Sequence, residues 1–73
     1  MSLLRAAVHI DHVSDMTDNR AAGAVVKALK ALDHRALVRV DMATFTVEIE
    51  PNTAGARQLS DAIKRAGYSP VAA

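Results

Sequence analysis

The chain has 73 residues, of which 51% are hydrophobic and 23% are charged, so it is long enough for one packed domain and too apolar for disorder. Nine basic and eight acidic residues nearly cancel, and only Phe45 and Tyr68 are aromatic. The chain therefore lacks both the excess of positive charge that binds a phosphate backbone and the aromatic side chains on which bases stack, which argues against a nucleic-acid partner. The absence of cysteine excludes disulfides and every thiolate metal site.

Residues 1–5 precede the first predicted element. They are too few and too weakly apolar for a signal peptide, and no segment has the roughly 20 consecutive apolar residues that span a bilayer. We therefore expect residues 1–5 to be disordered or left over from an expression vector. Residues 1–73 are expected to form a single cytoplasmic, monomeric domain without membrane insertion, either a whole protein or a fragment of a longer one.

The first predicted strand has the sequence AAVHIDHV, in which apolar and polar residues alternate with a period of two. In this frame Val8 and Ile10 face the core, and the histidine and aspartate that follow them face water. Val13 breaks the frame because three residues separate it from Ile10. A β-bulge near Asp11 or His12 would let both residues face the core.

A helix is predicted to begin near Asn19, because Thr17 or Asp18 can accept bonds from its first free amides. Apolar residues then recur at spacings of three and four, as they do on one helical face. This buried stripe consists of Ala22, Val25, Leu29 and Leu32.

Two strands follow a break at residues 33–35, in which His34 is expected at the surface. A turn at residues 43–45 joins them into a hairpin, and Pro51 ends the second strand. The residues expected to face the core are Val38, Val40, Met42, Val47 and Ile49.

Asn52 or Thr53 can cap a second helix, and Gly67 lies where a C-terminal glycine belongs. Pro70 cannot donate to a ladder, so a strand made by the tail must lie at a sheet edge. The helix should bury Ala56, Leu59, Ile63 and Ala66.

The order of these elements predicts an α+β, ferredoxin-like βαββαβ fold with two helices on one face of a four-stranded antiparallel sheet. The runs MTDNRAAGAVVKALKALD, VRVDMAT, VEIE and AIKRAGY resemble the heavy-metal-associated domain family over nearly the whole chain. That family includes small copper chaperones and the N-terminal modules of metal-transporting P-type ATPases. The resemblance implies a role in metal transport or homeostasis, with a protein partner such as a metal-transport ATPase or its other domains.

In that family the loop after the first strand reads Met-x-Cys-x-x-Cys, and its two thiolates bind one soft cation. Met16 and Thr17 match the opening of this motif. Asp18 stands where the first cysteine would be and Ala21 where the second would be, so both thiolate ligands are missing. The resemblance also places Tyr68 over the former metal loop.

Three interpretations of this departure stay open. In the first, the domain no longer binds soft metal and acts as an interaction or regulatory module, alone or as the N-terminal domain of a P-type ATPase. Its docking surface would be residues 15–21 with Tyr68, and would include Asp15, Asn19 and Arg20.

In the second interpretation, His12, Met16 and Asp18 bind a borderline divalent ion such as zinc, nickel, cobalt or copper(II). The competing structural account makes Asp18 a helix cap, Met16 a core residue, and His9 and His12 solvated strand residues. In the third, the cysteines were removed deliberately. An enzyme is not expected, because the sequence has no nucleophile with a convergent base and no glycine-rich phosphate loop.

Overall fold

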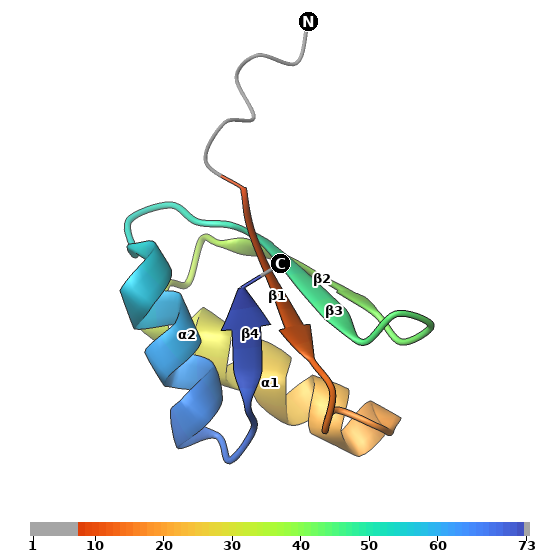
Figure 1. Cartoon of the computed structure of the whole chain (residues 1–73). Coiled ribbons are helices and arrows are strands. Elements are labelled where there is room, and N and C mark those ends of the chain that lie inside the picture. The colour runs from red at the N-terminus through yellow and green to blue at the C-terminus, as the bar shows by residue number, and fades with distance from the viewer. Residues whose placement is uncertain (1–7, 73) are drawn as a thin grey trace, which may run out of the picture.

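The computed structural model describes residues 8–72, and residues 1–5, predicted to be disordered or vector-derived, lie outside this part of the chain. Six elements follow one another in the predicted order (Figure 1). Their bounds are β1 His9–Val13, α1 Asn19–Leu32, β2 Leu37–Asp41, β3 Thr46–Glu50, α2 Ala56–Arg65 and β4 Pro70–Ala72. The predicted α+β class is confirmed.

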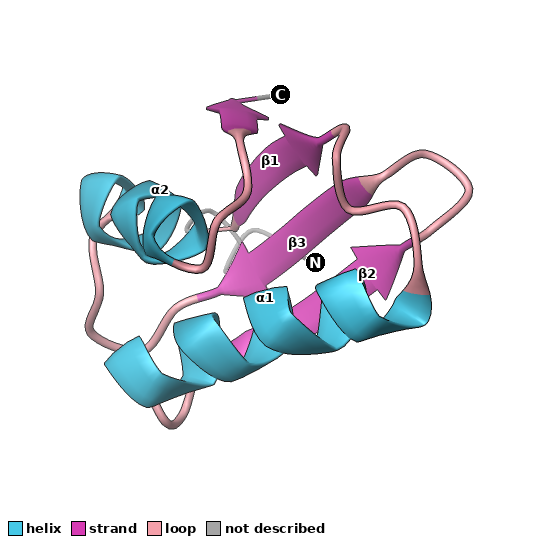
Figure 2. Ribbon diagram, turned by 90° about the horizontal axis from the view of Figure 1, so that it is seen from below, coloured by secondary structure: helices cyan, strands magenta, loops and turns pink. Residues whose placement is uncertain are grey.

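The four strands form one antiparallel sheet in the order β2-β3-β1-β4. Both helices cover the same face of this sheet, and no helix of the described residues covers the other (Figure 2). β4 lies at an edge of the sheet. Pro70 is tolerated there because a proline has no N–H to donate to a further strand. This is the ferredoxin-like topology that the order of elements predicts.

The core lies between the sheet and the two helices. It combines the apolar stripe of each helix with the inward residues of β1 and β3, and burial of this apolar surface is the main stabilising contribution to a domain of this size. The buried hydrophobic residues are Val13, Met16, Ala21, Val25, Leu29, Ala36, Val47, Ile49, Leu59 and Ile63. The predicted residues of β2 are half-buried and pack against this core: Val38 and Val40, with Met42 just beyond the strand.

The predicted frame of the first strand is wrong. Asp11 and Val13 are fully buried, whereas Ile10 is 38% exposed. No bulge interrupts the strand, because residues 9–13 pair in continuous register with β3 and β4. Val13, and not Ile10, therefore lies on the inward face of the strand. The Asp11 carboxylate lies on the same face and is buried.

α1 begins at Asn19 as predicted, and Asp18 is its N-cap in extended conformation. The buried stripe differs at both ends from the prediction. Ala21 is buried while Ala22 is only half-buried, and Leu32 is 40% exposed. The last residue that α1 contributes to the core is Leu29, about one turn before the end of the helix.

The predicted cap of the second helix is also wrong. α2 begins after Gly55, whose N–H donates to the Gln58 side chain over 2.8 Å. The amides of Asn52, Thr53 and Ala54 instead donate to one oxygen of Asp33, over 2.8, 2.8 and 3.0 Å. A carboxylate at the end of α1 thus closes the loop that precedes α2. Of the predicted stripe, Leu59 and Ile63 are buried, Ala66 is half-buried and Ala56 is exposed.

Two turns need a left-handed backbone. Gly67 follows the C-cap of α2 with φ of 100°, which confirms the predicted C-terminal glycine. Phe45 closes the β2–β3 hairpin with φ of 54°, a conformation that glycine adopts without strain and an aromatic residue does not. Its carbonyl accepts the Val13 N–H over 2.7 Å, so the hairpin turn contacts the end of β1.

Candidate functional site

Residues 14–18 connect β1 to α1, and they include Met16, Thr17 and Asp18, which the sequence resemblance assigns to a former metal loop. The Met16 N–H donates to the Val13 carbonyl over 3.1 Å, which makes a tight turn after the strand. The Met16 side chain is fully buried within the core cluster. Met16 therefore anchors the loop to the core, as the structural account of the sequence predicts, and its sulfur does not face solvent.

Asp18 and Ala21 contact each other directly. The Asp18 Oδ1 atom accepts the Ala21 N–H over 2.8 Å, so the carboxylate satisfies an amide that the first helical turn leaves unpaired. The negative charge also lies favourably at the positive end of the helix dipole. Ala21 is 6% exposed and belongs to the core. The two residues that the sequence resemblance places at the cysteine positions are therefore a helix cap and a buried core residue.

The loop between α2 and β4 is fastened to the former metal loop. The Ser69 N–H donates to the Asp15 Oδ1 atom over 3.1 Å. Tyr68, the neighbour of Ser69, is half-buried and packs against the core. We call residues 15–21 together with Tyr68 the former metal face. The exposed side chains on it are Asp15, Thr17, Asp18, Asn19 and Arg20.

The structure does not bring His12, Met16 and Asp18 together as a metal site. His12 is exposed and projects from the sheet face opposite to that of its buried neighbours Asp11 and Val13. Met16 lies in the core on the helix-covered side, and Asp18 is engaged as a cap. Within residues 8–72, no group of three or more His, Cys, Asp or Glu side chains could hold a metal ion.

A polar cluster that the sequence analysis missed lies on the inward face of β1. The Asp11 Oδ2 atom is 3.0 Å from His9 Nε2 and accepts a bond from Ser60 Oγ of α2 over 3.3 Å. The His9 side chain is only 15% exposed, so the prediction that it is a solvated strand residue is wrong. The signal available in the sequence was Val13, because the frame that buries Val13 also buries Asp11 and turns His9 inward.

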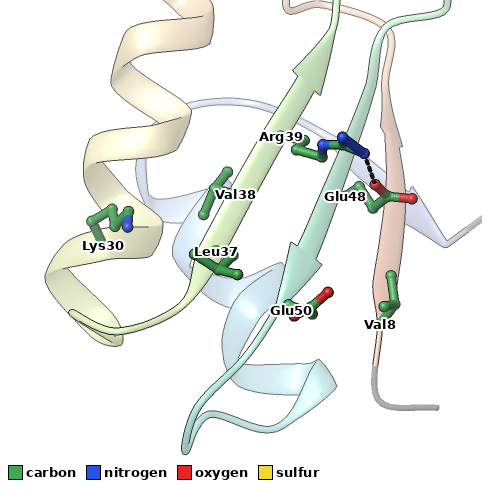
Figure 3. A pocket seen from close by; sticks show the side chains of 7 residues that line it. All are labelled: Val8, Lys30, Leu37, Val38, Arg39, Glu48 and Glu50. Carbon is green, nitrogen blue, oxygen red and sulfur yellow. Dashed lines mark hydrogen bonds and ion pairs between the residues drawn. The ribbon is translucent and has the colours of Figure 1, made fainter. Parts of the chain in front are cut away.

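The open face of the sheet carries a shallow groove. Figure 3 shows its lining, in which Leu37 and Val8 lie beside the acidic residues of β3. The only charge pair drawn there is Arg39 Nη1 with Glu48 Oε1 at 3.4 Å, and both side chains reach solvent. Most of the exposed large apolar residues also lie on this face: Ile10, Leu37 and Val71.

Neither helix of residues 8–72 is long and apolar enough to cross a membrane. No model of a known protein family matches the chain, and no curated protein matches it either. Solved structures do match.

A gold binding protein is 35% identical over 89% of this chain and 98% of its own, with a TM-score of 0.84. The copper chaperone Atx1 from Synechocystis PCC6803 is 34% identical over 85% of this chain and 97% of its own, with a TM-score of 0.81. The N-terminal domain of PacS from the same organism, at 21% identity and a TM-score of 0.75, shares the fold.

These likenesses, together with the βαββαβ sheet and its loop before α1, define a domain of the metal-trafficking type. The chain belongs to the heavy-metal-associated domain family. The chain has no cysteine, so it cannot supply the thiolate ligands of the family motif.

Proposed function

We propose that this domain is an interaction or regulatory module of a cytoplasmic metal-transport system, and that it docks a protein partner through the former metal face without carrying soft metal. The observation that supports this most directly is the bond from the Ala21 N–H to the Asp18 carboxylate. It gives both former ligand positions a structural task, so that the loop keeps its shape with no cation between them.

Copper(I) capture at this loop is chemically unsupported. Soft cations select thiolate and thioether ligands, whereas Asp18 offers a hard oxygen and Ala21 offers none. The one sulfur of the loop, in Met16, is fully buried. The likeness to a copper chaperone and to a gold binding protein supports metal trafficking as the setting of this domain. The missing thiolates favour regulation or docking as its role there.

The former metal face is suited to a polar, reversible contact. It presents charges of both signs, and the Asp15 bond to Ser69 holds its two loops together before any partner arrives. Preorganisation of this kind lowers the ordering cost of association. We propose a soluble domain of a metal-transport ATPase as the partner, either in another chain or in the same chain if this domain is an N-terminal module.

This proposal can be tested by titrating the ¹⁵N-labelled domain with the isolated soluble domain of a metal-transport ATPase from the same organism. Amide shifts should cluster in residues 15–21 and 67–69. Arg20→Glu should weaken binding by roughly fivefold, because it removes a surface attraction of up to ~1 kcal/mol. Arg39→Glu, on the open sheet face, is the matched control and should leave affinity unchanged.

Shifts confined to the open sheet face, or equal losses from the Arg20 and Arg39 variants, would show that the contact lies elsewhere. An absence of shifts at millimolar partner would remove the ATPase domain as the partner.

A further inference from the structure

β2 is an edge strand of the sheet (Figure 2). Its only neighbour among the strands of residues 8–72 is β3, so one side of β2 carries amide and carbonyl groups without a ladder partner. Such a row of groups is a template for a further strand. The opposite edge of the sheet is less suited to this, because β4 has three residues and begins with a proline.

The start of the β2 edge is already occupied. The Lys30 Nζ atom of α1 donates to the Ala36 carbonyl over 2.7 Å, directly before the strand begins. An added strand would therefore pair with residues 38–42. On the helix-covered side this segment carries three half-buried apolar side chains, those of Val38, Val40 and Met42.

The outward side chains of the same segment carry opposite charges two residues apart. Arg39 and Asp41 lie on the open face of the sheet, and both are exposed. The Arg39 side chain is 80% exposed and reaches across to Glu48 of β3 over 3.4 Å (Figure 3). The Asp41 Oδ1 atom accepts the Ala43 N–H over 2.9 Å, which fixes the position of its carboxylate.

A second copy of the chain complements this charge pattern in one register. When two β2 strands pair antiparallel about a two-fold axis at Val40, Arg39 of each copy lies opposite Asp41 of the other. Residues directly opposite in an antiparallel pair are close enough for opposite charges to attract. The same register brings the two Val40 side chains together on the helix-covered side.

Other registers are less favourable. An axis at Arg39 or at Asp41 would place two like charges opposite each other, which is destabilising. An axis at Val38 would bring Ala36 into the ladder, where Lys30 already holds its carbonyl. Charges usually protect an edge strand from pairing, whereas this pair of opposite signs protects β2 only from the registers that bring like charges together.

We propose that the domain self-associates through β2, which joins two four-stranded sheets edge to edge about an axis at Val40. The interface is small, so we expect a reversible dimer with a dissociation constant of roughly 0.1–1 mM. The domain is then a weak dimer and not the monomer expected from the sequence. β2 shares no residue with the former metal face, so self-association and partner docking can fail separately.

Dilution of the ¹⁵N-labelled domain from about 2 mM to about 20 µM tests self-association directly. Low salt should be used, because salt screens exposed charges. Amide shifts should change with concentration in residues 38–42 and should fit a monomer–dimer equilibrium. In a mixture of labelled and unlabelled chains, intermolecular NOEs should connect Val40 of one copy with Val40 of the other.

Charge reversal tests the register. Arg39→Asp and Asp41→Arg should each weaken self-association by about tenfold or more, because each variant places like charges opposite each other at both pairs. An equimolar mixture of the two variants should associate at least as tightly as the unmodified domain, because every acidic position again faces a basic one. Arg57→Asp, the same charge reversal at an exposed position of α2, should leave the association unchanged.

Shifts that do not change with concentration up to about 2 mM overturn the proposal. So do concentration-dependent shifts centred outside residues 38–42, an equal loss in the Arg57 variant, or a mixture of the two folded variants that associates no better than either alone. Asp41→Arg also removes the bond to the Ala43 N–H. If that variant fails to fold, the dilution series and the intermolecular NOEs of the unmodified domain decide the matter.

Discussion

Asp18 shows how a single residue can fix the start of a helix. Its carboxylate caps α1 through the Ala21 N–H, and an N-cap of this kind contributes about 1 kcal/mol to stability. At residue scale, the carboxylate that cannot serve as a soft-metal ligand serves instead to stabilise the start of the helix.

Restoring both cysteines should restore copper(I) capture. Asp18→Cys with Ala21→Cys recreates the spacing of the family motif, at the start of a helix where thiolates are favoured. We expect the double variant to bind one copper(I) ion in competition with a chromophoric chelator, and the unmodified domain to bind none. The double variant should also unfold about 1 kcal/mol more easily when metal-free, because the cap is lost.

Asp18→Ser with Ala21→Ser is the matched control for this prediction, because it keeps a capping hydroxyl and supplies no thiolate. Copper(I) retained by the serine variant would mean that ligands outside positions 18 and 21 hold the ion.

At the scale of secondary structure, Asp33 joins two elements that are distant in sequence. It is the C-cap of α1, and its carboxylate accepts the three amides that precede α2. The N–H groups of Thr53 and Ala54 hold the pKa of Asp33 below its ordinary value, although burial opposes them. These hydrogen bonds favour the ionised carboxylate of Asp33, so the connection that Asp33 makes between the two helices is strongest when Asp33 is negatively charged.

Asp33→Asn should therefore remove part of the acid sensitivity of folding. Because the pKa of Asp33 is lowered in the folded state, its contribution is complete above about pH 4 and disappears as the pH falls through the folded pKa. The unmodified domain should be the more stable of the two at neutral pH. Denaturant unfolding from pH 7 down to the acid limit should show the two stabilities converging.

Asp61→Asn, at an exposed carboxylate of α2, provides the comparison. A difference between Asp33→Asn and the unmodified domain that stays constant with pH would assign the loss to packing and not to ionisation.

The same elements show what could be predicted from the sequence. The Asp18 cap, the turn at Gly67 and the edge position of Pro70 depend on neighbours within a few residues, and each was predictable. The absence of thiolates is read directly from the sequence, which contains no cysteine.

Long-range partners were not predictable. Asp11 is held inward partly by Ser60, 49 residues away, and Asp33 caps amides about 20 residues further along the chain. An alternating strand has two possible phases, and only such tertiary partners decide between them. For the same reason the frame of β1 and the cap of α2 were predicted wrongly.

At the scale of the molecule, the apolar core is complete without a metal, and it includes Met16 and Ala21 as packing residues. Its buried residues lie between the sheet and both helices, and the domain lies within the size range that folds without metal or disulfides. We expect treatment with a chelator to leave the circular dichroism spectrum and cooperative unfolding intact. A domain that unfolds when metal is removed would show that an ion is part of the fold, as in zinc fingers.

β1 connects two polar parts of the molecule. Its first residue, His9, touches the buried carboxylate, and its last, Val13, leads into the former metal face. Four steps along an extended strand of about 3.3 Å each place ~13 Å between these residues. A substitution in the loop after Val13 therefore leaves the contact between His9 and Asp11 in place, and a substitution of His9 leaves the Asp18 cap in place, so the two ends of one short strand can be altered separately.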